Sequence, residues 1–233
     1  MGYKLDDKST VLYLFKGMEL FPNLSYVNNV IEAAEKVLKK REDHLTRDIL
    51  YICKAYVCLL EDYDLSKARM YAENIWNRLK KLDKFYLSEL HLLNGILFYF
   101  ELDTSIAMTN KALKELEKYY CFKEADELQM SFLSNLSCIL IAHKEYESAL
   151  NYVDQLISHT RSEYKVLTLG AALVRKGICL EALDDKTASQ SNYELAIKLF
   201  RIMERDDLVK LTLESPKLVY NLYGHVEVQE TSA

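Results

Sequence analysis

Proline and glycine are scarce in this sequence, which has 2 prolines and 6 glycines in 233 residues. Average proteins contain about 5% proline and 7% glycine. Both residue types form the turns of hairpins and bulges, so their scarcity argues against an all-β sandwich or barrel. It also excludes collagen-like repeats and glycine-rich phosphate-binding loops. Long helices joined by short turns are therefore the predicted architecture.

The chain has no excess of basic charge, because 30 Lys and Arg stand against 35 Asp and Glu. A mildly acidic chain is a poor non-specific binder of nucleic acid. The densest basic run is interpreted as a solvated helix end; it consists of Lys36, Lys39, Lys40 and Arg41. Five scattered cysteines without a C-x-x-C pair are typical of a reducing compartment. No apolar run approaches the roughly 18 residues of a membrane span, so we expect a cytoplasmic protein.

Apolar residues recur with helical spacing along nearly the whole chain. We predict helices over residues 9–20, 25–41, 44–61, 65–82, 85–100, 104–119, 124–143, 146–160, 164–182, 186–204 and 207–222. No linker rich in Ser, Gly or Pro divides them. We therefore expect one helical-repeat domain over residues 1–224, followed by a disordered tail over residues 225–233.

A repeat emerges when four acidic residues are aligned. They are separated by 37, 44 and 40 residues and are Asp64, Glu101, Glu145 and Asp185. The residue four positions after each is always small: Ala68, Ser105, Ala149 and Ser189. The acidic residue is expected to cap the next helix, and the small residue to let the partner helix approach closely. The pattern predicts an all-α, right-handed solenoid of antiparallel helical hairpins that resembles tetratricopeptide repeats.

A polar column accompanies this repeat. Ten residues before the acidic positions stand Lys54, His91, Asn135 and Arg175. Asn94 follows one turn after His91, and the flanking aromatic residues are Tyr51, Phe98 and Phe132. These eight residues are predicted to line the inner wall and to bind an extended peptide, since Asn can pair with peptide backbone and Arg or Lys with a carboxylate. The alternative is that the polar residues are the solvated flank of each helix.

Catalytic motifs are absent from the sequence. It contains no G-x-S-x-G, Walker loop, G-x-G-x-x-G or H-E-x-x-H, and its five histidines form no i, i+4 pair. We predict that the protein is not an enzyme, binds no metal and needs no cofactor.

Three segments resemble the C-terminal peptide-sensing domain of the Rgg/RNPP family of quorum-sensing transcription regulators. They run over residues 90–98, 132–150 and 206–224. The resemblance implies that Asn135 holds the backbone of a short signalling peptide and that Arg175 and Asn94 face the same groove. It also implies a homodimer, with contact through the C-terminal helices.

One departure from the family is that we identify no helix-turn-helix domain before the repeats, so DNA would be reached only through such a domain. The chain is then either a piece of a longer regulator or a stand-alone sensor. Two other functions stay open. One is a scaffold that binds a folded protein, and the other is an enzyme regulator such as a response-regulator phosphatase of the wider family.

Overall fold

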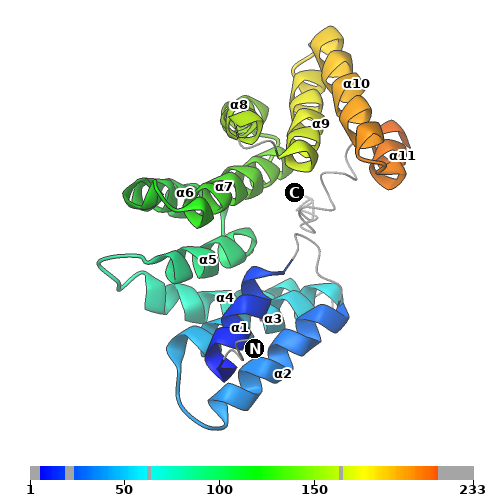
Figure 1. The fold of residues 1–233 in the computed structure, drawn as a ribbon. Coiled ribbons are helices and arrows are strands. Elements are labelled where there is room, and N and C mark those ends of the chain that lie inside the picture. Colours follow the sequence, from blue (N-terminus) through cyan, green and yellow to red (C-terminus); the bar gives the residue numbers. More distant parts are fainter. Residues whose placement is uncertain (1–5, 19–23, 62–63, 163–164, 215–233) are drawn as a thin grey trace. The chain divides into compact units, whose positions relative to one another are not determined.

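The computed structural model describes residues 6–18, 24–61, 64–162 and 165–214 (Figure 1). It divides into two compact units, Met1–Phe100 and Glu101–Ala233. The described residues contain helices and no strand, so the predicted all-α, tetratricopeptide-like class is confirmed. A single domain over residues 1–224 stays a prediction, and the predicted tail lies outside the described residues.

Unit 1 holds the first five helices and one short 3₁₀ segment. They are α1 (Asp7–Lys16), α2 (Leu24–Leu38), α3 (His44–Leu60), α4 (Leu65–Leu79), α5 (Leu87–Ile96) and η1 (Leu97–Tyr99). In this unit α1 packs on α2, α2 on α3 and α3 on α4. Five of the predicted helices are therefore present here, each within a few residues of its expected bounds.

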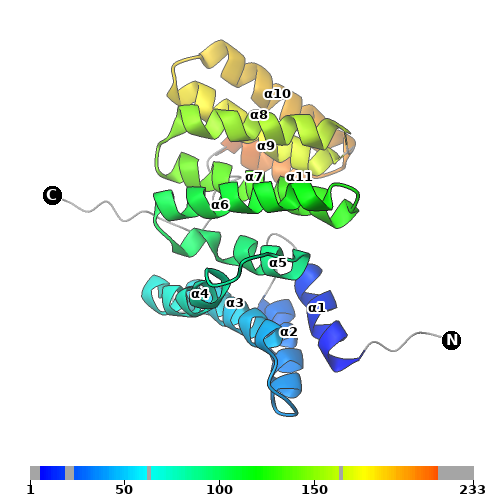
Figure 2. The same ribbon diagram turned by 90° about the vertical axis from the view of Figure 1, so that its left-hand side faces the viewer.

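Unit 2 continues the same pattern with six α-helices and one short 3₁₀ segment. They are α6 (Leu102–Leu116), η2 (Glu117–Tyr119), α7 (Lys123–Ala142), α8 (Tyr146–Ser162), α9 (Val166–Ala182), α10 (Lys186–Ile202) and α11 (Asp206–Glu214). Each helix packs against the next, from α6 on α7 to α10 on α11 (Figure 2). The predicted extension of the last helix to residue 222 lies outside the described residues.

The small residues of the repeat are all buried, as predicted. Ala68, Ser105 and Ala149 are completely buried, and Ser189 is 3% exposed. Ser189 shows why the position is small, because its Oγ donates to the Gly177 carbonyl across the α9–α10 hairpin at 2.8 Å. A longer side chain at such a position would push the two helices apart.

The predicted capping by acidic residues is confirmed at two of the four positions. Asp64 accepts from the Lys67 backbone N–H at 2.9 Å, and Asp185 accepts from that of Ala188 at 3.0 Å. The prediction was wrong for Glu101, whose side chain makes no cap hydrogen bond. Glutamate is one methylene longer than aspartate and is not among the preferred N-cap residues.

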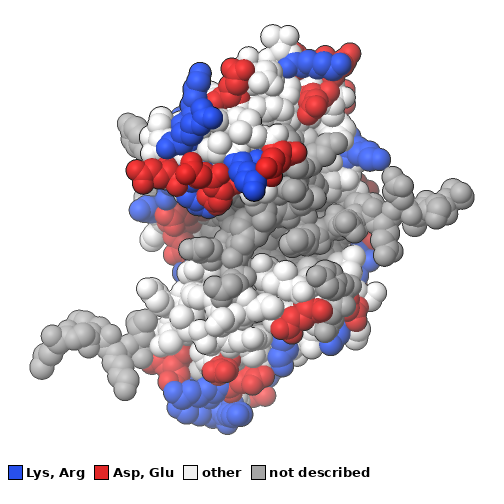
Figure 3. Space-filling model, turned by 90° about the vertical axis from the view of Figure 1, so that its right-hand side faces the viewer, with Lys and Arg blue, Asp and Glu red and all other residues white. Residues whose placement is uncertain are grey.

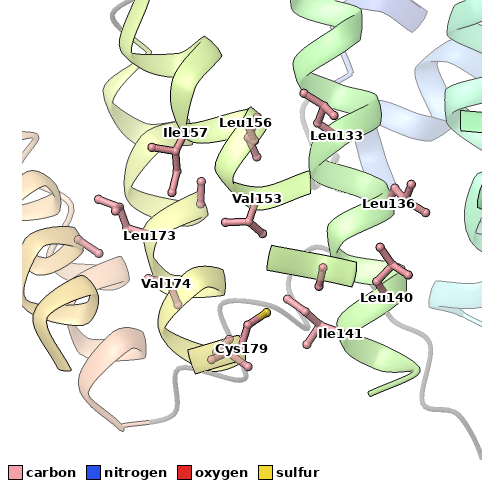
Figure 4. Packing of buried hydrophobic residues seen from close by; sticks show 14 of the residues in the cluster. Leu133, Leu136, Leu140, Ile141, Val153, Leu156, Ile157, Leu173, Val174 and Cys179 are labelled. Atoms are coloured by element: carbon pink, nitrogen blue, oxygen red, sulfur yellow. The ribbon is translucent and has the colours of Figure 1, made fainter. Parts of the chain in front are cut away.

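The core of unit 2 lies between α7, α8 and α9 (Figure 4). Leu133, Leu136 and Leu140 of α7 meet Val153 and Leu156 of α8 in this cluster. The i, i+3 and i+4 spacing of these residues places them on one face of each helix. Their burial removes a continuous apolar stripe from water and fixes the helix that carries Asn135.

Residues other than glycine form the tight turns of unit 2. The backbone of Lys144, Asp184 and Glu204 has positive φ angles of 62°, 65° and 54°. The next residue donates back across each helix end, from Glu145 N to Leu140 O and from Asp185 N to Leu180 O, both at 2.9 Å. This is the hydrogen bond of a Schellman cap, whose left-handed position is usually glycine. Such turns explain how the chain reverses direction with so few glycines.

Replacing Lys144 by glycine is expected to raise the free energy of unfolding by about 0.5–1 kcal/mol. A left-handed backbone costs an L-residue about 1–2 kcal/mol, and glycine avoids this cost. Part of the stabilisation is lost because glycine has more conformational freedom in the unfolded chain. The matched control is Lys144→Ala, which keeps the same steric penalty. Urea unfolding of both variants tests the expectation, and an equal effect of alanine and glycine would contradict it.

Two lysines of the basic run in unit 1 are paired with Asp7 of α1. Lys40 Nζ lies 2.6 Å from Asp7 Oδ2, and Lys36 Nζ lies 3.6 Å from Asp7 Oδ1. A further pair joins Lys8 to Asp43 at 2.6 Å. Blue and red side chains accordingly lie next to each other at the bottom of Figure 3. Lys36 and Lys40 are 66% and 62% exposed, which agrees with a solvated helix end.

Candidate functional site

Two of the predicted site residues lie on neighbouring helices of unit 2. Asn135 is on α7 and Arg175 is on α9, and α7 and α9 contact each other. Both side chains are buried, Asn135 at 6% and Arg175 at 1% exposure. Arg175 is the largest of the almost completely buried side chains among the residues described. Burying a guanidinium is costly, so its place in an apolar helix requires polar surroundings.

Two thiols form part of those surroundings. Burial raises the pKa of Cys138, and the nearby charge of Arg175 acts in the opposite direction. Burial likewise raises the pKa of Cys179 to about 12, again opposed by the Arg175 charge. Both cysteines are therefore neutral thiols, which suits weak hydrogen bonding and not nucleophilic attack.

Helical spacing connects these residues into one cluster. Cys138 lies three positions after Asn135 on α7, and Cys179 lies four positions after Arg175 on α9. Residues with these spacings share a helix face. The Arg175 charge acts to lower the pKa of a thiol on each helix, Cys138 on α7 and Cys179 on α9. The Asn135 face of α7 and the Arg175 face of α9 therefore meet where these two helices contact each other. We call Asn135, Cys138, Arg175 and Cys179 the α7–α9 polar cluster.

The sequence prediction missed the two cysteines of this cluster. The sequence shows Cys138 and Cys179 only as isolated cysteines without a C-x-x-C partner, which does not mark them as neighbours of Arg175. The one signal that could have indicated this neighbourhood is helical spacing, because Cys138 lies three residues after Asn135 and Cys179 lies four residues after Arg175. Phe132, also predicted for the site, is completely buried in α7.

The predicted residues on α3 of unit 1 have partners on neighbouring helices. Lys54 Nζ lies 3.4 Å from Glu35 Oε1 of α2, and both side chains are partly exposed. The Tyr51 ring packs against Tyr71 of α4, with ring centres 5.6 Å apart. A role of these two residues in ligand binding stays a prediction.

The remaining predicted residues of unit 1 lie at the end of its helical array. His91 and Asn94 are half-buried one turn apart on α5, and Phe98 is half-buried in η1. Gly95 directly follows Asn94 on α5, and a Cβ atom at Gly95 would come within 3.0 Å of Ile52 Cδ1 on α3. Because α3 and α5 approach each other closely at Gly95, this contact sets the distance of His91 and Asn94 from α3.

Within the residues that the structure describes, no group of His, Cys, Asp and Glu could hold a metal ion. None of the helices described is long and apolar enough to cross a membrane. The chemistry of the α7–α9 polar cluster is thus that of hydrogen bonding and of one buried positive charge.

Solved structures with the same fold include two proteins in complex with peptides. One is PlcR from Bacillus thuringiensis in complex with the peptide PapR7 and DNA, with a TM-score of 0.65 and 17% sequence identity. The match covers 91% of this chain and 76% of the PlcR chain. The other is the competence regulator ComR from Streptococcus vestibularis in complex with its signalling peptide XIP, with a TM-score of 0.58 and 14% sequence identity. The match covers 93% of this chain and 99% of the ComR chain.

A third structure of this fold is a Rap protein complexed with competence and sporulation factor. Its TM-score is 0.59 and its identity 13%, and the match covers 94% of this chain and 61% of that one. At these identities the three structures establish the fold alone. A comparison with curated protein sequences gave no match.

The sequence itself matches one family model. Residues 26–212 match the C-terminal domain of the helix-turn-helix transcriptional regulator Rgg. The matched range begins in α2 and ends in α11, so it includes every residue of the α7–α9 polar cluster. The chain therefore belongs to the family of Rgg C-terminal domains.

Proposed function

We propose that this chain is the sensor domain of a transcription regulator and that it binds a short linear signalling peptide at the α7–α9 polar cluster. The observation that carries the proposal is the burial of Asn135 and Arg175 on first helices of adjacent hairpins, in a chain of the Rgg family. PlcR and ComR, which share the fold, are each complexed with a peptide.

The chemistry of the two side chains suits a peptide backbone. The Asn135 amide can donate to a peptide carbonyl and accept from a peptide N–H at once. Arg175 offers several N–H donors in one plane, which match a carbonyl or a terminal carboxylate. Apolar peptide side chains would enter between the helices, as the neighbouring Phe132 is itself buried there.

Binding at this place requires a change in packing. Because Asn135 and Arg175 are only 6% and 1% exposed, a peptide reaches them when the surrounding side chains move apart. A ligand that favours the open arrangement shifts the population toward it. That shift is the proposed signal, passed to a helix-turn-helix domain that contacts DNA. We further infer a non-enzymatic role in the cytoplasm, as a homodimer.

The expected result is that Asn135→Ala weakens peptide binding by about 1–3 kcal/mol, the range for a lost buried hydrogen bond. Arg175→Ala is expected to weaken it by a similar amount. Isothermal titration with short apolar peptides measures both. The control is Asn151→Ala, which removes the same amide from an exposed position on α8. Unchanged affinity in both variants, with thermal melting showing folded protein, would contradict the assignment.

A further inference from the structure

A surface depression lies in unit 2, away from the α7–α9 polar cluster. It has a volume of about 390 Å³ and lies between α8, α9 and α10. Its lining residues are Asp154, Ile157, Ser158, Arg161, Leu173, Lys176, Asn192 and Leu195. We call it the α8–α10 pocket. Its volume is at the low end of the roughly 300–1,000 Å³ typical of ligand sites, so it suits a small molecule.

Helical periodicity explains why these residues converge. On α8 they stand at positions 154, 157, 158 and 161, on α9 at 173 and 176, and on α10 at 192 and 195. Spacings of three, four and seven place each set on one helix face. On α9 this face is turned roughly 130° from Arg175, at about 100° per residue. Figure 4 shows Leu173 and Cys179 pointing to different sides of α9. The pocket is therefore separate from the proposed peptide site.

The pocket carries two cations and one carboxylate. Lys176 Nζ lies 2.6 Å from Asp154 Oδ1, and the two side chains are 29% and 55% exposed. Arg161 is exposed and forms no ion pair with any residue that the structure describes. Since Lys has three N–H donors, Lys176 can contact a second acceptor while it keeps Asp154. The local charge therefore favours an anion, and Arg161 is the group that can pair with it bidentately.

The rest of the lining consists of three apolar residues and two polar ones, Ser158 and Asn192. Ile157 and Leu173 are buried at 7% and 2% exposure, and Leu195 at the edge is 40% exposed. Asn192 donates from Nδ2 to the Ala188 carbonyl at 2.7 Å, which leaves its Oδ1 as an acceptor. A small apolar patch in a mainly polar pocket with two cations matches a ligand with an acidic head and a short hydrocarbon tail.

We propose that the α8–α10 pocket binds a small organic acid, with its carboxylate on Arg161 and Lys176 and its apolar tail on Ile157 and Leu173. Asp154 competes with the ligand carboxylate for Lys176. Because the pocket spans α8, α9 and α10, an occupant ties three consecutive helices of unit 2 together.

The test uses isovalerate as the acidic probe and isoamyl alcohol as its neutral counterpart of similar shape. Binding to the full chain is followed by amide chemical shifts in NMR titrations. We expect saturable shifts at Ser158, Lys176 and Asn192 with isovalerate and at least tenfold weaker binding of the alcohol, which corresponds to about 1.4 kcal/mol. Equal binding of both probes, or no saturable shift in this region, would overturn the proposal.

Variants separate recognition from a structural effect. Arg161→Gln and Lys176→Gln are each expected to lower isovalerate affinity about tenfold, whereas Asp154→Asn raises it severalfold by freeing Lys176. The control is Lys186→Gln, an exposed lysine at the start of α10 that lies outside the pocket. An unchanged affinity in Arg161→Gln, or a lower one in Asp154→Asn, would contradict the assignment. Titrating a short apolar peptide in parallel keeps this result distinct from that for the α7–α9 polar cluster.

Discussion

Arg78→Leu is expected to lower the free energy of unfolding by about 2–3 kcal/mol at neutral pH. In the folded protein Arg78 Nε donates to Asp48 Oδ2 at 2.6 Å, and Nη2 of Arg78 contacts the same oxygen. This pair joins α3 to α4 inside unit 1. The Asp48 side chain is 6% exposed and that of Arg78 26%, so removal of the guanidinium leaves a buried carboxylate without its charge partner.

The loss should depend on pH. Burial raises the pKa of Asp48 above its ordinary 3.8, and Arg78 is the main group that acts against the rise. Between its unfolded-state pKa and its higher folded-state pKa, such a carboxyl group binds more protons in the folded than in the unfolded protein. The free energy of unfolding therefore falls as the pH rises through the range between these two pKa values. Without Arg78 the pKa rises further. The stability difference between variant and parent should therefore shrink as the pH falls from neutral into the acidic range.

Urea unfolding at neutral and mildly acidic pH measures both effects. The matched control is Lys118→Ala, which breaks a pair with a similar separation of 2.7 Å but with the lysine 58% exposed. Its cost should be below about 1 kcal/mol, because water screens an exposed pair. The double variant Asp48→Asn/Arg78→Leu should recover part of the loss. Equal costs for Arg78→Leu and Lys118→Ala would show that burial does not decide the effect.

Gly170→Ala is expected to destabilise the protein by about 2 kcal/mol, although alanine is the better helix former. A Cβ atom at position 170 would lie 2.4 Å from Phe200 Cε1. Phe200 is completely buried in the core of unit 2, so its ring has no space into which it can move. The overlap must be relieved by separating α9 from α10.

The second glycine of α9 supplies a matched comparison. A Cβ atom at Gly177 would lie 2.5 Å from Tyr193 Cε1, nearly the same overlap. Tyr193 is only half-buried, so its ring can turn toward solvent. Gly177→Ala should therefore be close to neutral, because the gain in helix propensity of about 1 kcal/mol offsets the shift of the ring. Chemical unfolding of the two variants measures the difference, and a larger cost at Gly177 would contradict this explanation.

Apolar spacing was sufficient to predict the helices of this protein. A helix buries residues at i, i+3 and i+4 whatever its partner, so the stripes around Leu136 and Leu156 were visible in the sequence alone. The close-packing role of the small residues of the repeat was predicted as well, and the burial of Ala68, Ser105, Ala149 and Ser189 confirms it. Local patterns of this kind need no knowledge of the tertiary contacts.

The turns and the depth of the site residues could not be predicted in this way. The left-handed backbone at Lys144 follows from the hydrogen bond between Glu145 and Leu140, which exists only once α7 has ended. The burial of Arg175 and its nearness to Cys138 depend on how α7 meets α9. The α8–α10 pocket likewise requires three helices to be in place. Spacing along one helix shows which residues share a face, but it does not show which face of another helix that face meets.

The most direct measurement is mass spectrometry of what co-purifies with the full chain from the cells that produce it, for the parent protein and for Asn135→Ala. We expect a short linear peptide with the parent and its loss or strong depletion with the variant, since the Asn135 amide is proposed to hold the peptide backbone. Recovery of a folded protein in place of a peptide, or of the same peptide in equal amounts with Asn135→Ala, would contradict peptide sensing at the α7–α9 polar cluster.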